Sequence, residues 1–139
     1  MPARLFVDAA VFMYVGGGQH PLKAPCATAL RRAVEAGTEL VTDSEVMQEI
    51  LYRYFSIGRA ATAATVFNAA TAICDEVLAV QLSTTEAALG ILLEAPSMSR
   101  RDAIHVASMR EHGIDSILTT DRDFDSIDGI TRVDPANLT

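Results

Sequence analysis

Short apolar runs alternate with longer stretches of helical periodicity along the whole chain. The apolar runs suit strands that are buried on both faces, and they fall near residues 5–7, 39–41, 77–80, 116–118 and 131–133. The longer stretches place apolar residues on one helix face and predict helices over residues 24–36, 44–55, 60–74, 85–93 and 100–112. Strands and helices in this order predict an α/β fold, with a central parallel β-sheet flanked by helices on both faces.

Nothing in the sequence divides this pattern into separate units. The chain has 139 residues, which fits one domain because domains commonly contain about 100–200 residues. It contains no internal repeat, linker or low-complexity segment. We therefore expect a single three-layer α/β/α domain over residues 1–139.

Two features indicate where the protein works. No apolar stretch approaches the ~20 residues that a membrane-spanning helix needs, and the N-terminal segment, with Asp8 inside its only apolar run, does not resemble a signal peptide. Cys26 and Cys74 lie far apart, and no Cys/His cluster has the spacing of a zinc site. The sequence therefore predicts a cytoplasmic protein with reduced thiols and no membrane attachment.

The charge balance is acidic, with a net charge of −7. Proteins that bind nucleic acids usually have an excess of Lys and Arg to contact phosphates, so the charge alone argues against an RNA partner. Carboxylates that are gathered to hold cations would leave the same acidic excess. Composition does not separate these explanations, so the positions of the acids have to decide.

Four acids are predicted to lie at one edge of the sheet. Asp8 directly follows the first predicted strand, and Asp121 lies just past the fourth. Glu49 lies one helical turn beyond Glu45 on the helix after the second strand, and Asp102 lies in the first turn of its helix. Ligands of open α/β sheets bind beyond the carboxyl ends of the strands. All four carboxylates can therefore point into one crevice.

Converging carboxylates repel one another unless a cation neutralises them. Oxygen ligands of this kind suit Mg²⁺ or Mn²⁺ rather than zinc, and such metals activate water and stabilise charge on a reacting phosphate. The sequence has no Gly-x-Ser-x-Gly motif, and neither cysteine has an evident His partner. We therefore predict metal-dependent phosphodiester hydrolysis, with catalytic and metal-binding residues Asp8, Glu49, Asp102 and Asp121.

Helix capping offers a structural explanation for some of the acids. Three helix starts resemble the capping box, in which an acid reaches back to the first residue: Thr42–Glu45, Ser83–Glu86 and Ser99–Asp102. Capping accounts for Glu45 and leaves Glu86 with no other role. For Asp102, capping and metal binding remain open alternatives.

The other acids have alternatives of their own. Glu49 could form an ion pair with Arg53 at i+4, and the acids at positions 121, 123 and 125 could form a solvated turn. Asp8 lies among apolar residues, where a carboxylate is costly without a charge partner. A functional role is therefore favoured most clearly for Asp8.

Four segments resemble the motifs of the PIN-domain family, and in particular its VapC-type ribonuclease toxins. Phe6-Val7-Asp8 with Val11-Phe12-Met13-Tyr14 resembles the opening strand, the first aspartate and the following helix. The conserved glutamate of the family falls on Glu49 in segment 41–51, and its later aspartates fall on Asp102 in segment 99–107 and Asp121 in segment 117–125. The resemblance covers essentially the whole chain, with the motifs in order.

This resemblance implies a PIN-like fold, dependence on Mg²⁺ or Mn²⁺, a homodimer, and a cognate antitoxin protein that blocks the site. It implies the toxin half of a type II toxin–antitoxin pair, an endoribonuclease. Its substrates would be structured RNAs, often tRNA or rRNA, cut in single-stranded loops. Hydrolysis at the metal site would leave a 5′-phosphate and a 3′-hydroxyl.

The sequence departs from the family at Ala9 and Ala10. The family usually has a hydroxyl residue directly after the first aspartate, followed by a small polar residue. Losing such an orienting group lowers affinity or activity by roughly 10–100-fold. We expect metal binding to persist, and the alternative is a catalytically impaired PIN-domain protein that acts by binding its antitoxin or RNA.

Basic residues flank the acidic motifs. Arg100, Arg101 and Arg122 could neutralise RNA phosphates, although surface charge explains them equally well. The net charge predicts that RNA contact is confined to such a local basic rim.

Several polar residues near the motifs have simpler interpretations. Thr119 or Thr120 could hold Asp121 or a water in place, and His105 is interpreted as a packed helix residue rather than a base. Gly16-Gly17-Gly18 is not followed by the Gly-Lys-Ser/Thr of a phosphate loop and predicts a turn.

Other phosphate chemistries fit less well. An aspartate-based phosphatase would also place Asp8 after its first strand, but it expects a second aspartate where Ala10 stands. A receiver domain expects a phosphorylated aspartate at the third strand, which residues 77–80 lack. A nuclease that cuts DNA remains an alternative within the same metal chemistry.

Overall fold

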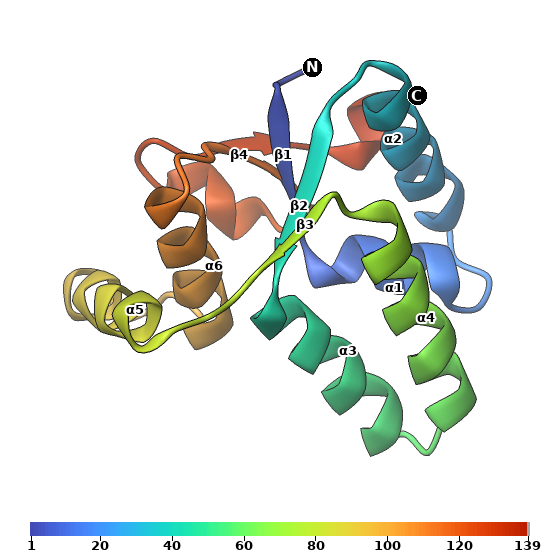
Figure 1. The fold of residues 1–139 in the computed structure, drawn as a ribbon, viewed down its shortest axis with the longest axis horizontal. Coiled ribbons are helices and arrows are strands. Elements are labelled where there is room, and N and C mark those ends of the chain that lie inside the picture. The colour runs from blue at the N-terminus through green and yellow to red at the C-terminus, as the bar shows by residue number, and fades with distance from the viewer. Residues whose placement is uncertain (139) are drawn as a thin grey trace.

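A computed structural model describes residues 1–138 and shows a parallel sheet between two layers of helices (Figure 1). The sheet has five strands in the order β3-β2-β1-β4-β5, and all four pairings are parallel. The strands are β1 (Arg4–Val7), β2 (Glu39–Asp43), β3 (Glu76–Leu78), β4 (Ser116–Leu118) and β5 (Thr131–Val133). The predicted α/β class and the parallel sheet are confirmed.

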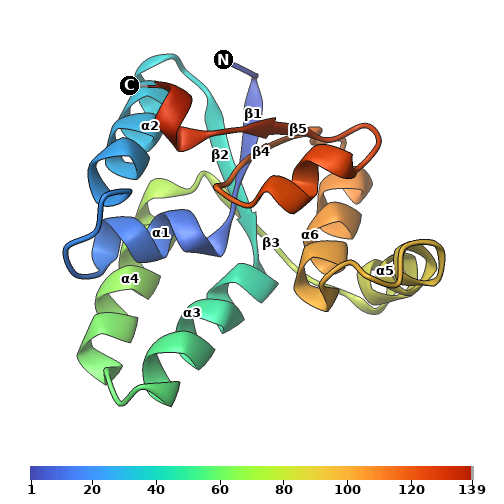
Figure 2. The ribbon, with the colours of Figure 1, turned by 180° about the vertical axis from the view of Figure 1, so that it is seen from behind.

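Six α-helices and two short 3₁₀ helices complete the fold. The α-helices are α1 (Ala9–Gly16), α2 (Lys23–Glu35), α3 (Ser44–Ser56), α4 (Ala60–Ile73), α5 (Leu82–Glu94) and α6 (Arg100–Glu111). The 3₁₀ helices are η1 (Arg122–Ser126) and η2 (Pro135–Leu138). Figures 1 and 2 show α1, α2 and α4 on one side of the sheet and α5 with α6 on the other. None of the helices among these described residues is long and apolar enough to span a bilayer.

The order of the strands reverses beside β1. The chain runs from β1 outward to β2 and β3, and it then returns past them to β4 on the other side of β1. β1 therefore pairs with β2 at Leu5↔Leu40 and with β4 at Val7↔Leu118. Helices on opposite faces separate at such a point and leave a crevice beyond the carboxyl ends of the strands.

Apolar residues dominate the central strands because both faces of the sheet are covered. The side chains of Leu5, Phe6 and Val7 in β1 are completely buried, as are Ile117 and Leu118 in β4. Burial of such residues is the main driving force for folding. Leu40 and Val41 of β2 are equally buried, so the three central strands together form the core of the sheet.

Two of the predicted helix caps are wrong. The cap of α3 is Asp43, whose Oδ1 accepts a 2.9 Å hydrogen bond from Val46 N, because the hydroxyl of Thr42 instead donates to Val7 O on the neighbouring strand. The helix α5 begins at Leu82, one residue before the predicted cap Ser83, and the N–H of Gln81 donates to the Thr84 hydroxyl. Glu45 and Glu86 therefore do not act in the predicted capping boxes.

The third predicted cap is confirmed. Ser99 Oγ accepts a 3.2 Å hydrogen bond from the backbone N–H of Asp102. The helix α1, expected only from the family resemblance, starts directly at Ala9 and is capped by Asp8. The predicted glycine turn is shifted, since Gly16 is the last residue of α1 and the turn begins after it.

Candidate active site

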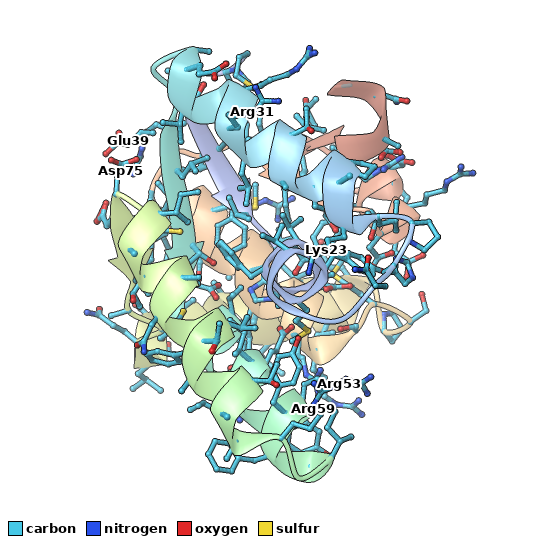
Figure 3. The ribbon with its side chains drawn as sticks, turned by 90° about the vertical axis from the view of Figure 1, so that its right-hand side faces the viewer. Lys23, Arg31, Glu39, Arg53, Arg59 and Asp75 are labelled. Carbon is cyan, nitrogen blue, oxygen red and sulfur yellow. The ribbon has the colours of Figure 1, made fainter. Side chains whose placement is uncertain are left out.

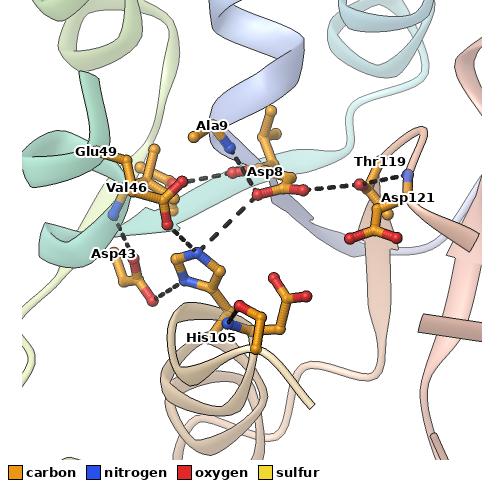
Figure 4. Close-up of polar contacts among 12 residues, drawn as sticks. Asp8, Ala9, Asp43, Val46, Glu49, His105, Thr119 and Asp121 are labelled. Atoms are coloured by element: carbon orange, nitrogen blue, oxygen red, sulfur yellow. Dashed lines mark hydrogen bonds and ion pairs between the residues drawn. The ribbon is translucent and has the colours of Figure 1, made fainter. Parts of the chain in front are cut away.

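Asp8 lies at the end of β1 and is held by hydrogen bonds of its backbone N–H and of its carboxylate, and Figure 4 shows the two bonds of the carboxylate to Ala9 and Thr119. Its backbone N–H donates to Leu118 O at 3.1 Å, which joins it to the end of β4. Its Oδ1 accepts from the N–H of Ala9 at 2.8 Å, and its Oδ2 accepts from the Thr119 hydroxyl at 2.7 Å. Burial raises the pKa of Asp8, although His105 and these hydrogen bonds act in the opposite direction. A buried carboxylate is thus held in one orientation.

Thr119 connects the ends of the two central strands. Its hydroxyl donates to Asp8 and accepts a 3.1 Å hydrogen bond from the backbone N–H of Asp121. The expectation that a threonine holds Asp121 in place is therefore confirmed for Thr119. A hydroxyl also reaches the first aspartate, although it comes from the residue that follows β4 and not from the position of Ala9.

His105 lies at the centre of an acidic cluster. It is a completely buried residue of α6, as its interpretation as a packed helix residue predicts. Its Nδ1 lies 2.8 Å from Asp43 Oδ2, and its Nε2 lies 2.8 Å from Glu49 Oε1 and 4.0 Å from Asp8 Oδ1. Glu49 thus bonds to this ring instead of forming the alternative ion pair with Arg53.

The imidazole of His105 is charged in this arrangement. Burial would lower its pKa, but the hydrogen bonds to Asp43 and Glu49 raise the pKa well above its usual value. Ionised carboxylates only accept hydrogen bonds, so a ring with a carboxylate at each nitrogen carries a proton on both. His105 therefore supplies a buried positive charge that offsets part of the surrounding negative charge.

Asp43 is the member of this cluster that the sequence reasoning missed. It is completely buried as the last residue of β2, where one oxygen caps α3 and the other contacts His105. A signal was present, because Asp43 ends an apolar strand just as Asp8 does. The predicted cap at Thr42 had placed the strand end too early.

A second group of acids faces the first from α6 and the β4–η1 loop. Ligand-type oxygens of Asp102, Asp121 and Asp123 lie within 4.8 Å of one another. The pKa of Asp102 is raised to about 7. Burial is the largest cause, and the nearby carboxylates of Asp8 and Asp121 contribute in the same direction. Asp125 belongs elsewhere, since both of its oxygens contact Arg132, at 2.8 and 3.2 Å.

One cleft of about 460 Å³ brings the predicted acids together. Its lining includes Asp8, Glu49, Asp102 and Asp121, with Asp123 beside them. The four residues come from β1, α3, α6 and the loop after β4 and meet at the strand-order reversal. Of the three flanking arginines, only Arg101 lines this cleft, and its guanidinium carbon lies 5.6 Å from the ring centre of Tyr52.

The donor atoms of the cleft fit a hard divalent cation. One atom each of Asp8, Glu49 and His105 lie within 4.8 Å of one another, and the second group adds three carboxylates. Both ring nitrogens of His105 are engaged, so the carboxylate oxygens remain as ligands, and Mg²⁺ and Mn²⁺ prefer oxygen. The raised pKa values of Asp8 and Asp102 reflect crowded, buried negative charge, which a cation would relieve.

Comparison with known proteins places this chain in a family. A family model described as the PIN domain matches residues 5–130 of the chain. The chain belongs to the PIN-domain family. Ribonuclease VapC13 of Mycobacterium tuberculosis is 40% identical to this PIN domain over 129 residues, which cover 93% of this chain and 98% of VapC13. Ribonuclease VapC23 of the same organism is 33% identical over 117 residues, covering 84% of this chain and 92% of VapC23.

Solved structures agree with this PIN-domain fold. VapBC2 from Rickettsia felis, bound to a DNA fragment from its promoter, matches with a TM-score of 0.75 at 10% identity, covering 94% of this chain and 98% of that one. VapC20 of Mycobacterium tuberculosis, described as a sarcin–ricin loop cleaving toxin, matches with a TM-score of 0.69 at 21% identity, covering 88% and 93%. The predicted resemblance to VapC ribonucleases, a group of nuclease enzymes, is confirmed.

Proposed function

We propose that this PIN domain, spanning residues 1–139, is the endoribonuclease toxin of a type II toxin–antitoxin pair. The observation that carries the proposal is the convergence of Asp8, Glu49, Asp102 and Asp121 on one cleft at the strand-order reversal. The identity of 40% to a VapC ribonuclease over nearly the whole chain supports the same activity. The reaction is hydrolysis of a phosphodiester bond in RNA.

The four acids would hold Mg²⁺ or Mn²⁺, because their oxygens face one cavity and carry excess negative charge. A divalent cation bound there supplies an activated water and stabilises charge on the reacting phosphate. The chain's own residues orient the acids. Thr119 fixes Oδ2 of Asp8, and His105 holds a proton between its Nε2 and Oε1 of Glu49.

His105 and Asp43 position Glu49 without entering the cleft. Both are completely buried, whereas Glu49 lines the cleft wall. Because Asp43 fixes one ring nitrogen of His105, the other points at Glu49 in a single orientation. Asp43 therefore affects the proposed metal site indirectly, by orienting the His105 ring that contacts Glu49.

The substrate we propose is a single-stranded loop of a structured RNA, such as tRNA or rRNA. The sarcin–ricin loop activity in the description of VapC20 supports a ribosomal target of this kind. The acidic net charge requires RNA contacts to be local, and Arg101 is the flanking cation that lines the cleft.

We also propose a cognate antitoxin and a second copy of the chain as protein partners. The structural neighbours include toxin–antitoxin complexes, such as one from Klebsiella pneumoniae with a TM-score of 0.65 at 15% identity, covering 94% of this chain and 97% of that one. α5 offers a surface for a partner, with Leu82 and Leu93 each 75% exposed. Exposed apolar side chains grouped in this way are typical of interaction sites.

The deciding experiment is cleavage of purified cellular RNA by antitoxin-free protein with Mg²⁺ or Mn²⁺. We expect discrete fragments that disappear with EDTA and in Asp8→Asn. The matched control is Asp128→Asn, which removes the same charge at an exposed position outside the cleft and should cut normally. Single-stranded DNA of matching sequence tests the alternative substrate.

Intact metal binding without cleavage of any RNA would contradict the proposal and favour the catalytically impaired alternative. Fragments that persist in Asp8→Asn would mean that another nuclease contaminates the preparation. Cleavage of DNA in preference to RNA would replace the substrate and leave the metal site in place.

A further inference from the structure

A second pocket, of about 360 Å³, adjoins the acidic cleft. Ala10, Met13 and Arg53 line both cavities, so the two share a wall formed by α1 and α3. The second pocket continues toward the end of α1 and the α3–α4 turn, where Tyr14, His20 and Arg59 line it. It therefore extends the cleft along the protein surface.

The charge of this pocket is opposite to that of the cleft and of the whole protein. The chain has 18 acidic and 11 basic residues, yet the lining of the pocket contains no Asp or Glu and includes two arginines. Lys23 adds a further positive charge beside it, where Nζ donates a 2.8 Å hydrogen bond to Gly17 O. Such local charge favours an anionic ligand.

The two arginines are available to a ligand. Both are exposed, and within residues 1–138 neither forms an ion pair with a carboxylate. Figure 3 shows Arg53 and Arg59 together at the α3–α4 end of the molecule, with Lys23 on the same side and Arg31 at the opposite end of α2. Unpaired guanidinium groups at one pocket are suited to phosphate oxygens.

Aromatic faces lie beside these cations. The rings of Tyr14 and His20 are 4.6 Å apart between centroids with an angle of 30° between their planes. Nδ1 of His20 accepts a 3.1 Å hydrogen bond from Leu22 N, so the neutral ring carries its proton on Nε2 as a donor. Paired aromatic rings next to arginines form the type of surface on which unpaired bases and their phosphates bind.

We propose that this pocket binds the single-stranded RNA next to the scissile phosphate, with Arg53 and Arg59 on backbone phosphates and a base stacked against the Tyr14–His20 pair. The inference rests on the proposed ribonuclease function. Because Arg53 borders both cavities, a strand whose reacting phosphate lies at the acids continues directly into the pocket. This placement explains how a protein of net charge −7 holds RNA close to a carboxylate cluster.

RNA fits these observations better than an acidic protein segment. An acidic peptide would use the cations but not the stacked rings, whereas a nucleotide uses both. The pocket also shares its wall with the cleft in which a phosphodiester would react. The test therefore has to distinguish binding of RNA in this pocket from binding of an acidic peptide.

The test is fluorescence anisotropy with a labelled single-stranded RNA of mixed sequence, in EDTA, with Asp8→Asn protein to prevent cleavage. Adding Arg53→Gln and Arg59→Gln should weaken binding at least tenfold and reduce the slope of log affinity against log salt by about 0.7 for each arginine. The matched control, Arg31→Gln with Arg32→Gln, changes the net charge equally on the far part of α2 and should leave both quantities nearly unchanged.

Removing the imidazole ring of His20 tests the proposed base stacking independently of the arginines. His20→Ala should weaken binding severalfold without changing the salt slope, because stacking releases no counterions. Thermal unfolding of each variant shows that the fold is intact. The same substitutions are then made in protein that retains Asp8, and RNA cleavage by these variants is measured. This measurement separates the present inference from the proposed ribonuclease function.

Three binding results would overturn the inference. They are no measurable RNA binding in EDTA, equal losses in the Arg53/Arg59 and Arg31/Arg32 variants, and loss of antitoxin affinity with unchanged RNA binding. The last result would assign the pocket to the protein partner. Normal cleavage by the Arg53/Arg59 variant would leave the ribonuclease proposal standing while rejecting this pocket.

Discussion

The hydroxyl of Thr119 donates a 2.7 Å hydrogen bond to Oδ2 of Asp8, although the two residues lie 111 positions apart in the chain. Both residues directly follow a central strand, so the pairing of β1 with β4 brings them together. Position 9, next to Asp8, is an alanine without a hydroxyl, so the hydroxyl that contacts Asp8 comes from the residue after β4. This bond gives the first acid a fixed orientation.

Replacing Thr119 with Val should therefore weaken metal binding while the fold persists. The change keeps the shape of a completely buried side chain but removes the donor to Asp8. Groups that orient ligands in this way are worth roughly 10–100-fold in metal affinity. Titration calorimetry with Mn²⁺ measures the loss, and Thr119→Ser should retain most of the affinity. Equal affinities for the Val and Ser variants would show that the hydroxyl has no such role.

Asp43 and His105 should behave as a coupled pair in unfolding experiments without metal. His105→Ala leaves the buried Asp43 carboxylate without its cationic partner and should cost about 3–5 kcal/mol. Adding Asp43→Asn removes that charge while keeping a good helix cap. The double variant should then be at least about 1 kcal/mol more stable than the sum of the single effects.

Urea denaturation of the wild type, both single variants and the double variant measures this coupling. His112→Ala is the matched control at an exposed position on the end of the same helix, and it should change stability by less than about 0.5 kcal/mol. Additive effects of Asp43→Asn and His105→Ala would mean that the pair carries no mutual stabilisation.

Metal binding should release protons near neutral pH because the pKa of Asp102 is raised to about 7. A carboxyl with a raised pKa is still protonated at pH 6 in the metal-free protein, and it must lose that proton to bind a cation. Affinity for Mn²⁺ should therefore rise up to about tenfold per pH unit below pH 7 and level off above it.

Calorimetry at pH 6 and pH 8, in buffers with different ionisation enthalpies, counts the protons released. We expect a larger release at pH 6, and we expect Asp102→Asn to reduce it. A release that does not change between these pH values would contradict the assignment of Asp102 to the metal site.

The sequence predicted the central strands because each contains a short apolar run. It predicted Asp8 and Asp121 from their places after strands, and Glu49 and Asp102 from their places on helices that begin near the same edge of the sheet. It missed Asp43 because the helix cap was assigned one residue early, to Thr42. Thr42 and Asp43 can both cap a helix. The choice depends on β1, because the Thr42 hydroxyl donates to Val7 O on that strand and leaves Asp43 to cap α3. The sequence also did not predict that His105 is protonated, because its two carboxylate partners lie 62 and 56 residues away along the chain.

Two glycines should respond oppositely to alanine. A Cβ at Gly16 would lie 2.5 Å from Cγ2 of buried Val66, because α1 and α4 approach closely at this point. Gly16→Ala should therefore destabilise the protein by about 1–3 kcal/mol. Gly90 lies inside α5 with open space around it, so Gly90→Ala should stabilise the protein by about 0.5–1 kcal/mol.

Thermal unfolding of both variants measures this contrast, and each serves as the control for the other. A stabilising Gly16→Ala would show that α1 and α4 can separate without cost. The sequence suggested only a turn at this glycine, since the partner helix lies about 50 positions away and is not visible in a local pattern.

The strand order also has a consequence for synthesis of the protein on the ribosome. β1, with Asp8, emerges before the other four strands, whereas Thr119 and Asp121 emerge only after β4. A growing chain that stops before β4 has the first acid but neither the strand that pairs with it nor the hydroxyl that orients it. A chain translated only as far as β3 therefore lacks the assembled cleft, and the four acids meet only after Asp121 has been added.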